Sequence, residues 1–330
     1  MTTPQAAERP FEDDRPSDHS GRRPGRLLRV SDLTPQELSG VLALAAEMKA
    51  DPLGWQHSCR GAALGCIFEK PSTRTRVSLT VAAYRLGMTT VPLDTREMQL
   101  GHGETWADTA RVLSTYLDAI TLRTFEHRTV QELADTATVP VVNALSNDHH
   151  PCQSLADLLA LTEHFGRTQG LRAAFVGDAR SNTCTSFLEA CAAAGMHLTI
   201  ASPPGYEMAP DVLAGARRTM EHTGGSVTFT PEPHDAVRDT DAVYAEVWVP
   251  MDRPDEEEDR RRRFADYRVD TALLDRAGPD AVALHCLPAN RGEEITSEVL
   301  DGPHSLAWRQ AANRLPTAQS VLHTLLNTSR

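Results

Sequence analysis

The chain has 330 residues and carries 33 Lys and Arg against 45 Asp and Glu, which gives a net charge of −12. Hydrophobic residues make up 40% and charged residues 24%, and the mean hydropathy is −0.36, the balance of a globular protein with about two domains. An acidic chain without a long apolar run has no overall attraction for nucleic acid or membranes. We therefore expect a cytoplasmic protein whose anion sites are built locally.

The predicted elements begin after a polar N-terminal segment. Residues 1–26 are rich in Pro, Arg, Asp and Glu and are predicted to form a disordered tail. The first helix is predicted to begin with Thr34 as N-cap and Pro35 in its first position. Short apolar runs, predicted as strands, then alternate with helical segments such as 154–164 and 186–195. The runs are 63–68, 90–93, 119–122, 139–142, 172–176, 197–201, 226–230, 242–247 and 281–285.

Strands that alternate with helices are typical of parallel sheets covered on both faces. The pattern therefore predicts an α/β fold with two doubly wound parallel sheets, one in each half of the chain, joined near residue 150. The charged run at 254–264, with acids first and bases later, is predicted to be a solvated helix.

The clearest local motif is IFEKPSTRTR at 67–76. An apolar strand ends at Pro71, Ser72 is a good helix N-cap, and apolar residues at helical spacing follow from 77 to 86. Backbone N–H groups at a helix start favour an anion, and the two arginines match the geometry of phosphate oxygens. The motif therefore predicts a phosphate site, without the Gly-rich loop that binds nucleotide triphosphates. A capped helix with surface arginines is the alternative interpretation.

This motif resembles the carbamoyl-phosphate motif of the aspartate/ornithine carbamoyltransferase family. Further matches follow in the family's order between about residues 27 and 328. They are QLG at 99–101 with Glu104 and DTARVL at 108–113, Arg123 in LRTFEH, HPCQ at 150–153, GD at 177–178 with Asn182, HCLP at 285–288 and NR at 313–314. Any one of these would be weak alone, but seven in order identify the chain as a member of the family.

The resemblance implies a fold and an activity. It places a carbamoyl-phosphate-binding domain at 27–150, an acceptor-binding domain at 151–310 and a C-terminal helix at 311–330 that returns to the first domain. The implied enzyme transfers the carbamoyl group of carbamoyl phosphate to an amine acceptor and releases phosphate, as a homotrimer or a multiple of it. No cofactor, metal, nucleic-acid partner or membrane partner is implied.

The resemblance also assigns site residues. The carbamoyl-phosphate site would comprise Ser72, Thr73, Arg74, Thr75, Arg76, Gln99, Arg123, His150, Gln153 and Arg314. The acceptor site would comprise Asn182, Glu246, Pro250, Met251, Asp252, Cys286 and Leu287. Arg123 and His150 would act at the carbonyl oxygen. Gln99 would come from an adjacent subunit, on a polar loop that has no apolar face to fold back on its own domain. His149 is expected at the surface.

Cys286 follows the predicted strand 281–285, where α/β enzymes place their chemistry. A nucleophilic thiol needs a general base, and the adjacent His285 would point to the opposite face of the strand. Covalent catalysis is therefore disfavoured. The resemblance places Cys286 beside the attacking amine, and we group it with Arg123 and His150 as catalytic.

The acceptor side departs from the family's pattern. Where the ornithine branch reads D-V-W-x-S-M-G, this chain reads EVWVPMD at 246–252. Glu246 is one methylene longer than aspartate, Pro250 lacks a hydroxyl and a backbone donor, and Asp252 adds a charge in place of glycine. TCT at 183–185 also replaces an Asn-rich stretch. These changes favour an ornithine-like diamino acid or a related amine as acceptor over neutral drift of a mobile loop.

Three alternatives remain open. The first is ornithine carbamoyltransferase proper, which forms citrulline. The second is a catalytically silent paralogue that binds carbamoyl phosphate, although Arg123, His150 and Gln153 are all present. The third is a Rossmann dehydrogenase, suggested by VGD at 176–178, which lacks G-x-G-x-x-G and a suitably placed acidic residue.

Overall fold

The computed structural model describes residues 25–250 and 256–328. Most of the predicted tail lies outside these ranges. The first strand begins at Arg26, one residue inside the segment predicted as tail, because Arg26 pairs with Val141. Within the described residues, no helix is both long and apolar enough to cross a membrane.

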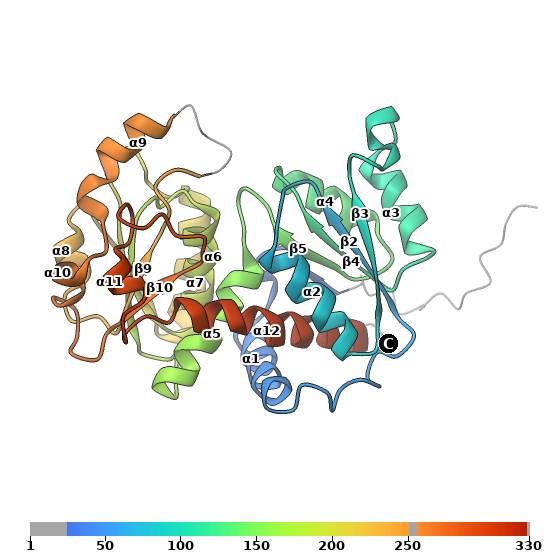
Figure 1. Cartoon of the computed structure of the whole chain (residues 1–330), viewed down its shortest axis with the longest axis horizontal. Helices are drawn as coiled ribbons and strands as arrows, with labels where there is room; N and C mark the ends of the chain where they lie inside the picture. Colours follow the sequence, from blue (N-terminus) through green and yellow to red (C-terminus); the bar gives the residue numbers. More distant parts are fainter. Residues whose placement is uncertain (1–24, 251–255, 329–330) are drawn as a thin grey trace, which may run out of the picture.

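Two parallel sheets form the framework, one in each half of the chain (Figure 1). The first sheet has the order β1-β5-β4-β2-β3, and the second has the order β10-β9-β6-β7-β8. The strands of the first sheet are β1 (Arg26–Leu27), β2 (Ala63–Phe68), β3 (Thr89–Asp94), β4 (Ala119–Arg123) and β5 (Val141–Leu145). Those of the second are β6 (Arg172–Val176), β7 (His197–Ala201), β8 (Ser226–Thr230), β9 (Ala242–Ala245) and β10 (Val282–His285). The predicted α/β fold is confirmed.

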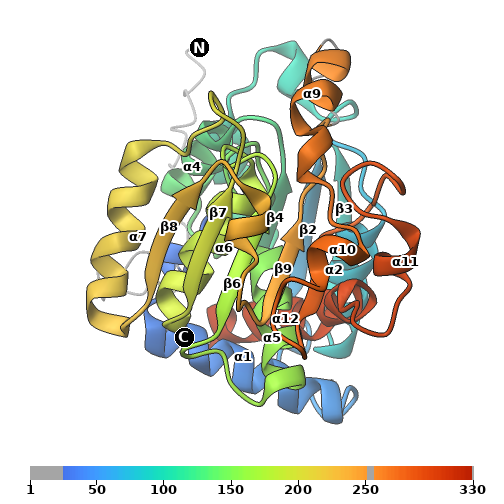
Figure 2. The ribbon, with the colours of Figure 1, turned by 90° about the vertical axis from the view of Figure 1, so that its left-hand side faces the viewer.

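Helices connect successive strands and cover both sheets (Figures 1 and 2). In the first half they are η1 (Val30–Asp32), α1 (Pro35–Ala50), α2 (Arg74–Arg85), η2 (Gln99–His102), α3 (Trp106–Ser114), α4 (His127–Thr136) and α5 (Pro151–Phe165). In the second half they are α6 (Asn182–Ala194), α7 (Pro210–Thr223), α8 (Pro233–Ala236), α9 (Glu257–Phe264), η4 (Ala265–Tyr267), α10 (Thr271–Leu274), α11 (Ser297–Leu300) and α12 (Ala307–Thr328).

Burial on both faces explains why β2 reads as a continuous apolar run. Its five residues from Leu64 to Phe68 are buried. Leu64, Cys66 and Phe68 pack in the core formed with α2 and α12, whereas Ile67 packs on the opposite side with residues of α3 and α4. The alternation follows from the two-residue period of a strand.

Helix α12 joins the two halves. It begins beside β10 and packs against α5, α1 and α2, the helices of the first sheet (Figure 1). Its residues Val321 and Leu325 lie in a core cluster with Leu38 of α1 and Phe175 of β6. The predicted return of the C-terminal helix to the first half is confirmed.

The strand order indicates where a ligand would bind. The direction in which successive strands are added to the sheet reverses between β2 and β4 in the first sheet and between β6 and β9 in the second. Ligands of such sheets bind beyond the carboxyl ends of the strands at these points. Strand β9 ends at Ala245, two residues before the predicted end, so Glu246 lies in the loop beyond it. Strand β5 begins at Val141, after Pro140, which has no N–H to donate.

Candidate active site

Helix α2 begins next to the carboxyl end of β2. Thr73, not Ser72, is its N-cap, so the predicted cap is wrong by one residue. Thr73 has helical backbone angles and its side chain makes no capping hydrogen bond. The first backbone N–H groups of α2 are therefore not satisfied by a cap, which is the arrangement that binds anions at helix starts.

Three arginines from distant parts of the chain meet at this helix start. Nη2 of Arg74 donates to the carbonyl of Leu287 at 2.7 Å, across the two halves of the molecule. Arg314 of α12 donates through Nη2 to Oγ1 of Thr75 at 3.0 Å and through Nη1 to Oε1 of Gln153 at 2.8 Å. Arg123, at the end of β4, is the third.

The charges of these arginines act on one another. Burial lowers the pKa of Arg123 to about 10, and the charges of Arg314 and Arg74 add to the effect. Within the described ranges none of the three forms an ion pair with a carboxylate, and Nε of Arg123 and of Arg314 is buried without a hydrogen-bond partner. Uncompensated guanidinium groups with free donors favour a multiply charged anion.

His150 stands beside the same arginines, directly before α5. Its backbone N–H donates to Oγ of Ser186 at 2.7 Å, and its Nδ1 is buried without a partner. Burial, followed by the charges of Arg314, Arg123 and Arg74, lowers its pKa well below the usual range. His150 is therefore a neutral imidazole at pH 7, which can donate a hydrogen bond without adding charge.

Asp157 supports the site and was not predicted from the sequence. Its Oδ1 accepts from Nε2 of Gln153 and from Nε2 of Gln310, each at 2.8 Å, and its Oδ2 accepts from the Tyr244 hydroxyl at 3.1 Å. Burial raises its pKa to about 6. These bonds orient Gln153 so that its carbonyl oxygen accepts from Arg314. The spacing of Gln153 and Asp157, four residues apart on one helix, is the signal that could have indicated the pair.

The other residues predicted to bind the phosphate make fewer contacts with the three arginines. Ser72 is half-buried and Thr73 is exposed at the start of α2. The Arg76 guanidinium lies over the Phe68 ring, 4.4 Å from its centroid. In the described part of the chain, no side-chain hydrogen bond joins Ser72, Thr73 or Arg76 to Arg123 or Arg314.

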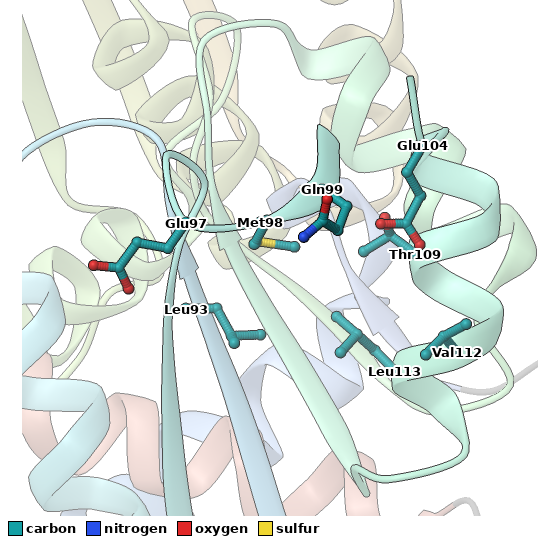
Figure 3. Close-up of a pocket in the computed structure, with 8 residues that line it drawn as sticks. All are labelled: Leu93, Glu97, Met98, Gln99, Glu104, Thr109, Val112 and Leu113. Carbon is teal, nitrogen blue, oxygen red and sulfur yellow. The ribbon is translucent and has the colours of Figure 1, made fainter. Parts of the chain in front are cut away.

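Gln99 lies apart from the arginines of its own chain. It is exposed on η2 and lines a pocket between that loop and α3 (Figure 3). Leu93 and Met98 pack against the core of the first sheet, so the prediction that this loop has no apolar face toward its own domain is wrong. The loop is therefore held against its own domain by Met98, while the neighbouring Gln99 side chain is exposed.

Glu246 is the buried carboxyl group at the acceptor end. Its side chain bonds with Thr183, whereas its Oε2 is buried without a partner. Burial raises its pKa to about 8, with further contributions from the charges of Asp178, Glu294 and Asp157. A buried carboxyl group with an unpaired oxygen and acidic neighbours is suited to receive a cation.

Cys286 shares the Thr183 hydroxyl with Glu246. Burial, then the charges of Glu246 and Asp157, raise the pKa of the Cys286 thiol well above its usual range. The thiol is therefore protonated at neutral pH and is unsuited to nucleophilic attack, because the thiolate is the reactive form.

The remaining residues predicted to bind the acceptor differ in their contacts and burial. Asn182 donates from Nδ2 to the carbonyl of Ser146 at 2.6 Å, and so links α6 to the turn before His150. Leu287 has a positive φ of 55° and presents its carbonyl to Arg74. Pro250 is half-buried at the end of the described segment. Met251 and Asp252 lie outside the described residues.

His149 is buried, with 6% exposure, so its predicted surface position is wrong. The turn before it folds inward, since Ser146 N–H donates to the His149 carbonyl at 2.9 Å. The His149 ring packs on His127, with centroids 4.6 Å apart, and Nδ1 lies 3.8 Å from Oε2 of Glu189. Burial lowers the pKa of His149 to about 3, with contributions from the charges of His127 and Arg29.

This shift predicts a loss of stability in acid. Between pH 6.5 and about 3 the unfolded chain binds a proton at residue 149 that the folded chain does not, so stability falls by about 1.4 kcal/mol per pH unit. We expect His149→Phe to reduce the change in urea midpoint between pH 7 and pH 4.5, and His222→Phe, at an exposed position, to leave it unchanged. Parallel losses in wild type and His149→Phe would contradict the assignment.

No group of three or more His, Cys, Asp or Glu among the described residues could hold a metal ion. The polar groups that converge at the site are thus the arginines, the neutral imidazole, the carboxamide of Gln153 and the acidic side chains around Glu246. One end can hold an anion and the other an ammonium group, with Cys286 and Leu287 between them.

Comparison with known proteins gives consistent matches along the chain. Residues 26–163 match the family described as aspartate/ornithine carbamoyltransferase, carbamoyl-P binding domain, and residues 169–325 match its Asp/Orn binding domain. The ornithine carbamoyltransferase of Acidothermus cellulolyticus is 50% identical over 92% of this chain and 97% of its own length. That of Mycolicibacterium paratuberculosis is 47% identical over 92% and 98%. The structure of the Pyrococcus furiosus ornithine carbamoyltransferase, at 42% identity, covers 90% of this chain and 96% of its own, with a TM-score of 0.86.

Proposed function

The chain belongs to the aspartate/ornithine carbamoyltransferase family and is a carbamoyltransferase, and we propose that its acceptor is the primary amine of an ornithine-like diamino acid or a related amine. The observation that carries the proposal is that one site has a cationic end and an acidic end. Arginines without carboxylate partners, among the described residues, lie at one end, and Glu246 with an unpaired oxygen lies at the other.

The two ends of the site are assigned to different parts of the chain. We propose that residues 27–150 bind carbamoyl phosphate, that 151–310 bind the acceptor, and that 311–330 return to complete the first site through Arg314. The hydrogen bonds from Arg314 to Thr75 and Gln153 support this reading, because they join three separate segments at the phosphate end.

The proposed residue roles follow from charge and hydrogen bonding. Ser72 to Arg76, the start of α2, would hold the phosphate together with Arg314. Arg123 and neutral His150 would donate to the carbonyl oxygen, where negative charge develops as the amine attacks. Gln153 would hold the carbamoyl end through the side chain that Asp157 orients.

The reaction itself needs positioning and charge stabilisation. A neutral amine forms a C–N bond with the carbonyl carbon, the bond from that carbon to the phosphate oxygen breaks, and the amine proton leaves on phosphate. Glu246 would bind an ammonium group of the acceptor, and Cys286 and Leu287 would line the attacking amine. Protonated Cys286 would contribute contact and polarity, not a covalent bond.

The acceptor is the finer part of the proposal. The relatives' names favour ornithine, whereas Glu246, Pro250 and Asp252 favour an acceptor of different length or charge. The test is a screen of phosphate release from carbamoyl phosphate with ornithine, other diamino acids and diamines. Release with ornithine alone would favour citrulline formation, release with another amine would favour the altered acceptor, and no release with any amine would favour a silent paralogue.

We also propose that the active unit is a homotrimer, or a multiple of it, in which Gln99 reaches the neighbouring site. Gln99 is exposed, and exposed apolar side chains lie nearby on α3 and after it, with Val112 at 46% and Tyr116 at 72% exposure. Helix α2 exposes Val77 and Tyr84, which are seven residues apart and so lie on one face, as a second apolar pair suited to association.

Mixing two inactive variants tests the shared site. Gln99→Ala and Arg74→Ala chains are each expected to have little activity alone. In a mixed three-membered ring, one site combines an intact Arg74 with an intact Gln99 from its neighbour, so random mixing should restore about a quarter of wild-type activity. Phosphate release after mixed refolding is the measurement. No recovery in rings shown to be mixed would contradict the shared site.

A further inference from the structure

The four consecutive arginines of α9 do not share one environment. The side chains of Arg261, Arg262 and Arg263 are 48%, 75% and 49% exposed, whereas that of Arg260 is 1% exposed. The prediction that this charged run is solvated is therefore wrong at Arg260. The reason is the helical period, since Arg260 and the buried Phe264 lie four residues apart on the face that turns toward the second sheet.

The buried guanidinium has three polar partners. Nη2 of Arg260 lies 2.6 Å from Oδ2 of Asp178, and Nη1 lies 3.3 Å from Oε2 of Glu256. Nε donates to the carbonyl of Trp248. The Tyr206 ring lies 5.1 Å from the guanidinium carbon. A charge that is bonded on all sides and buried against a ring has one defined position, so its partners are fixed as well.

Two of these partners flank Glu246. Trp248 follows it by two residues in the chain. Asp178 follows Gly177, where an added Cβ would lie only 2.8 Å from Cβ of Glu246, so the two backbones are in close contact. Arg260 therefore joins the end of β6 to the segment that carries Glu246.

Asp178 also acts on Glu246 by charge. After burial, the effects that raise the pKa of Glu246 are the charges of Asp178, Glu294 and Asp157, and the Thr183 hydrogen bond lowers it. The ionisable groups that interact with Glu246 come from the loop after β6, from α5, α6 and β9, and from the segment after β10. They are Asp178, Asp157, Cys184, Tyr244, Cys286 and Glu294. None of the six is basic, and the three carboxyl groups among them oppose a charge on Glu246, so the ionised carboxylate of Glu246 needs compensation from elsewhere.

We propose that Arg260 is a positioning residue for acceptor binding, which holds the Glu246 segment through Trp248 and partly compensates Asp178, so that Glu246 can ionise when the acceptor's ammonium group binds beside it. The inference rests on the proposed function, because it takes Glu246 as the group that receives the acceptor's ammonium. Asp178 also pairs with Arg180, whose Nε lies 3.3 Å from Oδ1 and whose side chain is 40% exposed. Without Arg260, this partly exposed arginine would be the only guanidinium of the described residues left on Asp178, so the charge of Asp178 would be less fully compensated and would favour the protonated form of Glu246.

The test separates the two substrates. With the best amine from the acceptor screen, Arg260→Gln is expected to raise the acceptor KM at least tenfold at pH 7.5 and to change the carbamoyl-phosphate KM less than twofold. The acceptor defect should shrink as the pH rises, because Glu246 ionises again. The double variant Arg260→Gln/Asp178→Asn should recover part of the loss, since it removes the charge of Asp178 but does not restore the bond to Trp248. Arg261→Gln, the neighbouring exposed arginine, should match wild type.

Arg260→Lys covers the case in which Arg260→Gln does not fold. Lysine retains the charge beside Asp178 but cannot bond three partners, so a smaller rise confined to the acceptor KM is expected. An equal rise in both KM values, or no rise in either, would overturn the inference. A double variant as poor as Arg260→Gln at every pH would overturn its electrostatic part. Wild type that carbamoylates no amine would overturn the proposed function instead.

Discussion

Arg74→Ala is expected to lower kcat/KM for carbamoyl phosphate by about a thousandfold or more. Arg74 stands at the first turn of α2, and its guanidinium donates a hydrogen bond to the Leu287 carbonyl. A guanidinium paired with a phosphate in a partly desolvated site contributes several kcal/mol, and about 1.4 kcal/mol corresponds to a factor of ten. Without it, the remaining arginines and the helix start would hold a dianion weakly.

Two further variants test whether the loss is specific to the guanidinium group at position 74. Arg74→Lys keeps the charge but loses the planar fork, so it is expected to recover only part of the activity. Arg85→Ala changes an arginine at the opposite end of the same helix and should have little effect. The measurements are steady-state phosphate release and the melting temperature of each variant. Near-normal kinetics of Arg74→Ala, with the carbamoyl-phosphate KM unchanged, would show that the phosphate does not bind here.

The second large effect concerns the acceptor. The triple variant Glu246→Asp/Pro250→Ser/Asp252→Gly is expected to raise kcat/KM for ornithine, relative to the best other amine, about tenfold to a hundredfold. Asp252 places a negative charge near the end of the acceptor segment in the sequence, and a carboxylate beside it would be repelled, whereas a second ammonium would be favoured. In wild type we therefore expect ornithine to be a poorer acceptor than an amine that is more cationic, differently spaced or blocked at its carboxylate.

The expected change in the kcat/KM ratio follows mainly from the charge of Asp252 and the side-chain length of Glu246. Replacing Glu246 with Asp withdraws the carboxyl group by one methylene, and the other two changes remove a charge and restore a donor. A change of about 1–3 kcal/mol in relative binding covers this range of ratios. Glu258→Gln, which removes an exposed charge on α9, is the matched control and should leave the ratio unchanged. If wild type uses ornithine best and the triple variant does not improve it, the three differences are drift.

Several features could be predicted from the sequence because they depend on neighbouring residues. The strands at 63–68, 172–176, 197–201 and 226–230 agree with β2, β6, β7 and β8. Strands β2 and β6 are buried on both faces and so are apolar runs, whereas β8 lies at a sheet edge, is largely exposed and is indicated by its Val, Thr and Phe residues. Thr34 caps α1 with Glu37 in a reciprocal pair, as its local pattern indicates. The family motifs, read in order, identified the chain as a carbamoyltransferase relative, and the comparisons confirm this.

Other features were decided by the tertiary structure, because they depend on residues far apart in the chain. The hydrogen bond between Arg314 and Thr75 joins positions 239 residues apart, and that between Arg74 and Leu287 joins positions 213 apart. No spacing rule predicts such contacts, because the first arises only when α12 returns to the first half and the second only when the two halves pack together.

Burial of polar residues was likewise decided by packing. His149 and Arg260 are polar residues in polar stretches, and the sequence favoured a surface position for both. Each is instead buried, with 6% and 1% exposure, because folding places a partner beside it: the His127 ring for His149, and Asp178 with the Trp248 carbonyl for Arg260. A charged side chain such as that of Arg260 becomes stable in the interior only when its bonds are supplied there, whereas His149 is neutral and its buried Nδ1 has no hydrogen-bond partner. In both cases the packing partners come from segments that the local sequence does not reveal.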